Sequence, residues 1–323
     1  MSVPYIDGAT VSRLLPFETC ISVVAESMKD LSAGRIQSPL RQIVDLGSGS
    51  AFGTMPGAMI DAGVFGAKLM SVFPGNVATG LPAHQGVIVL FESTHGQPVA
   101  VVDAASVTHI RTAAASAAAT QILARHDADK LLVIGSGAQA EAHAIALAQV
   151  RDFREIRIWG RSLAKSSALA RLLAEQHGLP ATAVASIEEA AAESDVICTT
   201  TSSMTPVLDH HIVRPGTHIN AVGSSRLGPI EIAPELAAKA RFFGDYRPSV
   251  LAQGSEFVAA KDAGLFDDDH FLGELGELIA GTTAGRVSEV DITLYKSLGH
   301  VAQDIASAWH VARAANAIPA TEK

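Results

Sequence analysis

The sequence has little cysteine: only Cys20 and Cys198 occur among its 323 residues. Two cysteines so far apart provide neither a disulfide framework nor the close spacing of a metal motif. The adjacent His210 and His211 have no nearby cysteine or acid to complete a metal site. We therefore expect no disulfide-stabilised fold and no metal, and we predict a protein of the reducing cytoplasm.

Long apolar runs and basic blocks are also missing. The Ala-rich stretches are interrupted before the roughly 20 residues that a membrane span needs, so we expect no membrane association. Residues 1–7 lack the basic and apolar regions of a signal peptide. With 33 acidic against 24 basic residues and a formal net charge of -9, no basic stripe indicates a nucleic-acid partner.

What remains is an ordinary globular composition, with 48% hydrophobic and 18% charged residues. This composition excludes a disordered chain, and the length leaves room for two domains. The first third predicts one helix over 10–34, a strand over 41–46 and further strands over 64–72, 85–92 and 98–103.

The most informative stretch is residues 130–141. An apolar run of strand length leads into a glycine turn, and an Ala- and Glu-containing segment of helical composition follows. Gly135, Gly137 and Ala140 match the G-x-G-x-x-G/A dinucleotide fingerprint in this strand-turn-helix context, although a plain turn gives the same pattern. Small residues there allow the tight turn, the approach to a pyrophosphate and close helix packing. We predict that a dinucleotide contacts Gly135, Gly137, Ala138, Gln139 and Ala140.

Strands and helices alternate after this loop, which predicts a parallel, doubly wound sheet. We expect helices over 138–149 and 163–177, strands over 155–159, 195–201, 217–222 and 240–244, and a helical segment from about 288 onward. A very Ala-rich helix over 108–125 connects the two halves of the chain.

The second strand of such a unit normally ends in an acid that binds the ribose of NAD. Here it ends in Gly160, Arg161 and Ser162. Arg161 can pair with a 2′-phosphate and Ser162 can add a hydroxyl, so we favour NADP(H), with NAD(H) as the alternative and a solvated arginine as the plainer interpretation. The further predicted cofactor-binding residues are Thr112, Gly160, Arg161, Ser162, Thr199, Thr200, Thr201, Val222 and Gly223.

Several long motifs, in order along nearly the whole chain, resemble the ornithine cyclodeaminase/mu-crystallin family. They are residues 55–56, 66–76, 81–86, 108–114, 135–140 and 291–299. The resemblance implies a homodimer with an α/β fold, in which a Rossmann-type doubly wound parallel sheet domain accompanies a mixed α+β substrate-binding and dimerisation domain. The dinucleotide domain would span 116–301, and the other domain 1–115 with 302–323.

Three basic residues match the family's carboxylate-binding set: Arg41, Lys68 and Arg111. Lys68 lies in an apolar run where an unpaired lysine is costly. Arg111 lies near a helix N-terminus, where a cation opposes the helix dipole. Both placements favour a functional role, whereas Arg41 could also be a surface residue. We predict that all three are catalytic and bind the substrate, with Lys68 orienting the nitrogen side.

Three more substrate-binding candidates are His84, Ser225 and Arg226. His84 lies in a family motif and could equally be structural. Ser225 stands where the resemblance places the acid of the cyclodeaminases, which disfavours deamination. Arg226 could pair with a second carboxylate, as in iminosuccinate, or be a solvated loop residue.

The resemblance therefore implies an NAD(P)H-dependent imino-acid reductase, reversible as an L-amino-acid dehydrogenase. Its substrate would be a 2-imino carboxylate, either cyclic, such as pyrroline-2-carboxylate, or linear, such as iminosuccinate. Two alternatives stay open: an ornithine cyclodeaminase with bound NAD, and a non-catalytic NADPH-binding protein.

Overall fold

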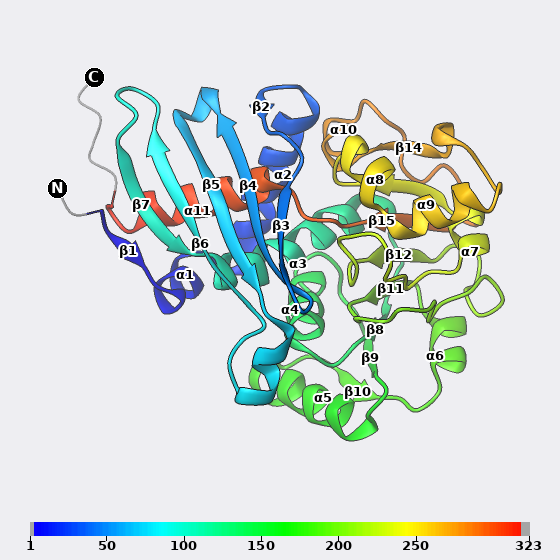
Figure 1. Ribbon diagram of the computed structural model, residues 1–323. Helices are drawn as coiled ribbons and strands as arrows, with labels where there is room; N and C mark the ends of the chain where they lie inside the picture. The colour runs from blue at the N-terminus through cyan, green and yellow to red at the C-terminus, as the bar shows by residue number, and fades with distance from the viewer. Residues whose placement is uncertain (1–2, 318–323) are drawn as a thin grey trace. The chain divides into compact units, whose positions relative to one another are not determined.

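The computed structural model describes residues 3–317. Within this part the chain forms two compact units: one ends at Arg111 and resumes at His300, and the other is Thr112–Gly299. The sequence places these boundaries at 115/116 and 301/302, and residues 318–323 of the first predicted domain lie outside the described residues. Each unit has its own sheet, and the helix α3 (Ala104–Leu123) runs from one unit into the other (Figure 1).

The first unit contains a mostly antiparallel sheet with the order β1-β7-β6-β5-β4-β2, and β3 pairs with β4. Its strands are β1 (Tyr5–Ile6), β2 (Ile36–Gln37), β3 (Gln42–Gly47), β4 (Ser50–Met59), β5 (Val64–Val72), β6 (His84–Glu92) and β7 (Pro98–Asp103). Its helices are α1 (Gly8–Leu14), α2 (Phe17–Ser32), α11 (Val301–Ala314) and the 3-10 turns η1 (Ile60–Ala62) and η2 (Pro74–Thr79). The largely buried α11 packs on α2 and on β4, β5 and β6.

The structure of this unit differs from the sequence predictions in two main ways. The single helix predicted over 10–34 is divided into α1 and α2, because Pro16 takes an extended conformation at the N-cap of α2 and cannot continue α1. The strand β4 was not predicted, because Gly53, Pro56 and Gly57 interrupt its sequence with residues of low β propensity.

The second unit contains an eight-stranded parallel sheet with the order β10-β9-β8-β11-β12-β15-β13-β14. Its strands are β8 (Lys130–Ile134), β9 (Glu155–Trp159), β10 (Ala181–Ala183), β11 (Val196–Thr199), β12 (His218–Ala221), β13 (Arg241–Gly244), β14 (Phe271–Glu274) and β15 (Thr293–Lys296). Its helices are α4 (Ala138–Leu147), α5 (Leu163–His177), α6 (Ile187–Glu193), α7 (Pro234–Lys239), α8 (Arg247–Gln253), α9 (Ser255–Asp262), α10 (Leu275–Ala280) and the 3-10 turn η3 (Asp268–His270). The predicted fold class is confirmed.

The helical segment predicted from 288 is also corrected by the structure. Residues 293–296 form β15, which lies between β12 and β13, and helix α11 begins only at Val301. All four residues of β15, Thr-Leu-Tyr-Lys, are buried, so the alternation of apolar and polar residues that marks a half-buried strand is missing.

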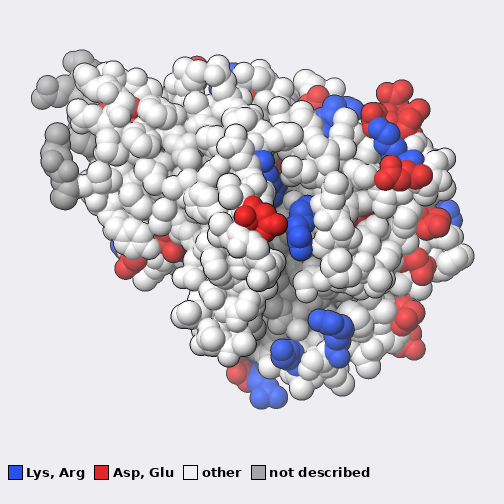
Figure 2. All heavy atoms as spheres, viewed as in Figure 1, with Lys and Arg blue, Asp and Glu red and all other residues white. Residues whose placement is uncertain are grey.

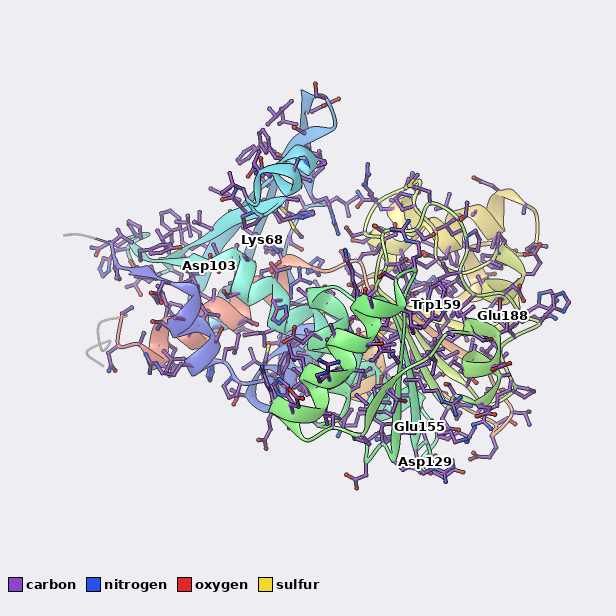
Figure 3. The ribbon with its side chains drawn as sticks, turned by 90° about the horizontal axis from the view of Figure 1, so that it is seen from below. Lys68, Asp103, Asp129, Glu155, Trp159 and Glu188 are labelled. Atoms are coloured by element: carbon purple, nitrogen blue, oxygen red, sulfur yellow. The ribbon has the colours of Figure 1, made fainter. Side chains whose placement is uncertain are left out.

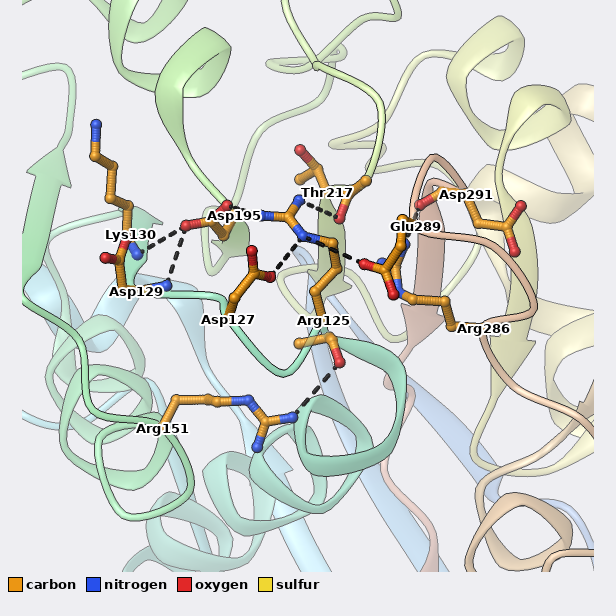
Figure 4. A network of polar contacts seen from close by, with 12 residues as sticks. Arg125, Asp127, Asp129, Lys130, Arg151, Asp195, Thr217, Arg286, Glu289 and Asp291 are labelled. Atoms are coloured by element: carbon orange, nitrogen blue, oxygen red, sulfur yellow. Dashed lines mark hydrogen bonds and ion pairs between the residues drawn. The ribbon is translucent and has the colours of Figure 1, made fainter.

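A polar network ties the strands together at the amino-terminal edge of the parallel sheet (Figure 4). The buried carboxylate of Asp195 accepts a hydrogen bond from Arg125 at 2.6 Å and another from Arg214. It also accepts the backbone N–H groups of Asp129 and Lys130, each at 3.1 Å. These contacts fix the starts of β8 and β11. In open parallel sheets of this kind, ligands bind at the opposite, carboxyl edge.

The charged side chains visible in Figure 2 do not form one continuous patch. On this face the basic side chains lie in small separate groups, and no continuous basic stripe crosses the face. No helix among the described residues is long and apolar enough to cross a membrane.

Gly66 on β5 offers a test of the packing in the first unit. A Cβ at this position would lie 2.1 Å from the carbonyl oxygen of Val89 on β6. We expect Gly66→Ala to destabilise the first unit by about 3 kcal/mol, because the two backbones must separate. Gly75→Ala is the matched control, since a Cβ there meets no atom within 4 Å. Thermal unfolding measures both, and equal melting temperatures would contradict the close approach.

Candidate active site

The glycine loop has the shape that a dinucleotide pyrophosphate requires. Gly135 has a φ of +138°, and a Cβ there would lie 2.4 Å from the hydroxyl oxygen of Thr200, so only glycine fits. Gly137 is the N-cap of α4, no side chain caps this helix, and a Cβ at Gly137 would meet nothing within 4 Å. The first N–H groups of α4 therefore face an open cradle, which fits an anionic ligand.

The end of β9 lies next to this loop. Figure 3 shows Glu155 and Trp159 at opposite ends of the strand, and the backbone N–H of Gly135 donates to the carbonyl of Trp159 at 2.8 Å. A Cβ at Gly160 would lie 3.2 Å from Ser136 Oγ. Arg161 is exposed. Ser162 is the N-cap of α5 and accepts from Lys165 N at 3.4 Å, which leaves its hydroxyl proton for another acceptor.

The ends of β11 and β12 come together around one buried carboxylate, that of Glu231. It accepts hydrogen bonds from Thr199 Oγ1 at 2.7 Å, Thr201 N at 2.6 Å and Gly223 N at 2.7 Å. Val222 N donates to the carbonyl of Thr199 at 3.0 Å. These hydrogen bonds therefore link, at the carboxyl edge of the sheet, four residues that were predicted to bind the cofactor: Thr199, Thr201, Val222 and Gly223.

Two predicted residues of the first unit share a second buried carboxylate. Asp304 Oδ1 on α11 lies 3.1 Å from Lys68 Nζ on β5 and 2.9 Å from Arg111 Nε on α3. Lys68 also donates to Thr108 Oγ1 at 2.7 Å, and Arg111 donates to Gln303 Oε1 at 2.9 Å. The three charged residues are at most 5% exposed. Figure 3 labels Lys68 on its strand.

The electrostatics of this cluster explain how it holds two cations. Burial lowers the pKa of Lys68 to about 8, against the opposing effect of Asp304. Burial alone would raise the pKa of Asp304, but the charges of Arg111 and Lys68 outweigh it and leave that pKa below its ordinary value. Lys68 can therefore gain or lose a proton near neutral pH, while Asp304 stays ionised.

The remaining predicted residues are four for the substrate, Arg41, His84, Ser225 and Arg226, and one for the cofactor, Thr112. The charge of Arg41, just before β3, is near enough to lower the pKa of Lys68. His84 begins β6, and burial and then the charge of Lys68 lower its pKa. Ser225 and Arg226 are exposed in the loop after β12 of the second unit. Thr112 lies in α3, at the first position of the second unit. The roles of all the predicted site residues, these five included, stay predictions.

Sequence reasoning missed the two carboxylates at the centres of these clusters. Asp304 is an acid on the buried face of a helix, next to Ile305, and Glu231 is an acid between Ile230 and Ile232. An acid inside an apolar run was the available signal, because an ionised carboxylate is buried only with partners. Over residues 3–317 no group of three or more His, Cys, Asp or Glu side chains is arranged to hold a metal.

Asp304→Asn tests the coupling between Asp304 and Lys68. The variant removes the charge that raises the pKa of Lys68, so this pKa should fall below about 8. NMR titration of protein labelled with ¹³C-lysine measures the shift, and Lys68→Met identifies the resonance. The control is Asp61→Asn, an exposed acid of the same unit, which should leave the titration unchanged. A Lys68 pKa that stays at about 8 in Asp304→Asn would show that the carboxylate does not control it.

The comparison with known proteins agrees with this geometry. A Delta(1)-pyrroline-2-carboxylate reductase of Bacillus cereus is 33% identical over 295 residues, which are 91% of this chain and 90% of the relative. The structure is similar to the Delta(1)-pyrroline-2-carboxylate reductase of Thermococcus litoralis in complex with NADH and L-proline. The TM-score is 0.94 at 28% identity, over 97% of this chain and 98% of the other.

An archaeal alanine dehydrogenase dimer with bound NAD is also similar, with a TM-score of 0.92, 30% identity and 98% of each chain covered. The two solved relatives therefore hold NADH or NAD. The model of the ornithine cyclodeaminase/mu-crystallin family matches residues 7–317. The chain belongs to the ornithine cyclodeaminase/mu-crystallin family.

Proposed function

We propose that the protein is an NAD(P)H-dependent imino-acid reductase that adds hydride to the α-carbon of a 2-imino carboxylate and runs in reverse as an L-amino-acid dehydrogenase. The observation that carries this proposal is the cluster in which Lys68 and Arg111 share the single carboxylate of Asp304. Two buried cations with one buried anion leave a positive charge that calls for an anionic ligand. A substrate carboxylate supplies that charge.

In this mechanism the guanidinium of Arg111, with Arg41, binds the substrate carboxylate. Lys68 lies on the nitrogen side: its ammonium donates a proton to the amine nitrogen that reduction produces, and its neutral form accepts that proton in the oxidative direction. A pKa of about 8 makes both forms available near neutral pH.

The dinucleotide would supply or accept the hydride, and the second unit fits it. The uncapped N–H groups of α4 would hold its pyrophosphate. Arg161 and Ser162 would take a 2′-phosphate, which is our reason for favouring NADP(H) over NAD(H). The loops after β11 and β12 remain for the nicotinamide half, because the strand order places them on the other side of β8 from β9.

The substrate we favour is a cyclic imine such as pyrroline-2-carboxylate, which is the substrate named for the Bacillus cereus and Thermococcus litoralis relatives. A linear substrate such as iminosuccinate would need Arg226 to bind its second carboxylate. Ser225 supplies no acid for the water addition of a cyclodeaminase, and a protein that only bound a nucleotide would have no use for the excess charge beside Asp304.

We also propose that the protein is a homodimer. Ile43, Val44 and Leu46 on β3 are 60%, 55% and 52% exposed, which is unusual for three apolar side chains in one short strand. The alanine dehydrogenase relative is a dimer. The cytoplasmic location stays a prediction.

The direct test of the function is oxidation of NADPH and NADH at 340 nm with a panel of imines. The panel contains pyrroline-2-carboxylate, piperideine-2-carboxylate, and oxaloacetate or pyruvate with ammonia. We expect turnover with a cyclic imine. Lys68→Met should reduce kcat by about 100-fold or more and change cofactor affinity little, since the lysine handles the substrate proton.

Other outcomes of this assay would overturn parts of the proposal. Turnover with oxaloacetate and ammonia alone would point to a linear dicarboxylate and to Arg226. Ammonia release from ornithine without added cofactor would indicate a cyclodeaminase. NADPH binding without turnover of any imine would indicate a non-catalytic protein. Equal losses of kcat and cofactor affinity in Lys68→Met would remove the catalytic role of Lys68.

Arg161 gives a separate test of the cofactor preference. Arg161→Ala should weaken NADPH binding by about tenfold and leave NADH binding nearly unchanged, because only NADPH carries the 2′-phosphate. Lys165→Ala, another exposed cation close by in α5, is the control. Isothermal titration calorimetry measures both affinities. Equal effects of Arg161→Ala on the two cofactors would show that Arg161 does not select NADP(H).

A further inference from the structure

The side chain of Glu231 joins both loops at the carboxyl ends of β11 and β12. Its Oε1 accepts Thr201 N–H at 2.6 Å, and its Oε2 accepts Gly223 N–H at 2.7 Å. Thr199 Oγ1 adds a third hydrogen bond to Oε2 at 2.7 Å. The side chain is fully buried. One carboxylate therefore fixes the distance between two separate loops.

The hydrogen bonds from Thr201 N and Gly223 N require a carboxylate at position 231. Each of its oxygens faces a backbone N–H, which can only donate. A glutamine would turn its amide N–H₂ towards one of these donors and lose that hydrogen bond. Gly223 is equally constrained, because a Cβ there would lie 2.0 Å from the carbonyl oxygen of Thr201 and 2.5 Å from Glu231 Oε1.

The residue is itself held in place by a second buried layer. Glu231 N donates to Glu256 Oε1 at 3.2 Å, and Glu256 Oε2 lies 2.7 Å from Lys296 Nζ. The carbonyl of Glu231 accepts the N–H groups of Val207 and Leu208 at 2.8 and 3.1 Å. Glu256 and Lys296 are both 0% exposed. These contacts hold the backbone of Glu231 in place. Glu231 in turn fixes the loops after β11 and β12 before any ligand binds.

The position of these loops identifies what they would hold. In the sheet, β8 lies between β9 and β11. A dinucleotide whose pyrophosphate lies on α4, after β8, extends its adenosine half towards the end of β9. Its other half extends the opposite way, over the ends of β11 and β12. Glu231 would therefore lie under the nicotinamide side only.

We propose that Glu231 is a positioning residue for the nicotinamide half of the cofactor, acting through the backbone of Thr201 and Gly223. The proposal rests on the dinucleotide site of the proposed function. If this is so, replacing Glu231 should weaken the binding of NADH, which carries nicotinamide. It should leave the binding of ADP-ribose, which lacks nicotinamide, nearly unchanged.

The experiment measures the affinities of NADH and ADP-ribose by titration calorimetry. In Glu231→Gln, NADH should bind about tenfold or more weakly, because one buried N–H loses its acceptor, while ADP-ribose affinity should change less than about twofold. Thr199→Val removes one donor and keeps both backbone contacts, so NADH affinity should fall by a smaller factor. The control is Glu175→Gln, the same chemical change at an exposed site of the same unit, with no effect on either ligand.

Parallel losses of NADH and ADP-ribose affinity in Glu231→Gln would overturn the proposal, because they would indicate a general structural role. Unchanged NADH affinity would also overturn it. If circular dichroism shows that Glu231→Gln is unfolded, Thr199→Val decides: a loss confined to NADH supports the proposal and any other result overturns it. Failure of the wild-type protein to bind either ligand would instead refute the dinucleotide site itself.

Discussion

The first unit depends on one buried carboxylate. Lys68 and Arg111 come from a strand and a helix, and both would be costly inside an apolar interior without Asp304. The shared oxygen compensates most of that cost but leaves an excess positive charge, and this imbalance is the chemical basis of the proposed substrate site. Burial, opposed by the charge of Asp304, lowers the pKa of Lys68 to about 8, where proton transfer is possible under ordinary conditions.

The second unit also contains a central buried carboxylate, but this carboxylate has a different role. Glu231 is also fully buried, but its partners at the loop edge are two neutral backbone N–H groups and a hydroxyl. Burial raises its pKa, and the hydrogen bond from Thr199 and the charge of Lys296 act in the opposite direction. In the first unit the carboxylate of Asp304 balances the charges of Lys68 and Arg111. In the second unit the carboxylate of Glu231 fixes the backbone of the loops after β11 and β12. Each unit thus has an acid at its centre that defines its candidate binding surface.

Local patterns in the sequence predicted the parts of the site that are local. The glycine loop occupies adjacent positions, so its residues and its strand-turn-helix context could be recognised directly. Asp304 could not be found in this way, because its partners Lys68 and Arg111 are 236 and 193 residues away in the sequence. The strand β15 was predicted as part of a helix, since its polar residues Thr293 and Lys296 are buried by the fold and give no strand alternation in the sequence. The sequence predictions failed where contacts between residues far apart in the sequence determine the structure.

The order of elements along the chain has a consequence for biosynthesis. The second unit is contiguous, Thr112–Gly299, whereas the first is completed only by α11, which follows it in the sequence. During translation β5 and α3 therefore emerge long before the acid that neutralises Lys68 and Arg111. Until α11 leaves the ribosome the nascent first unit must keep these two cations in water, so the dinucleotide unit is the one that can close first.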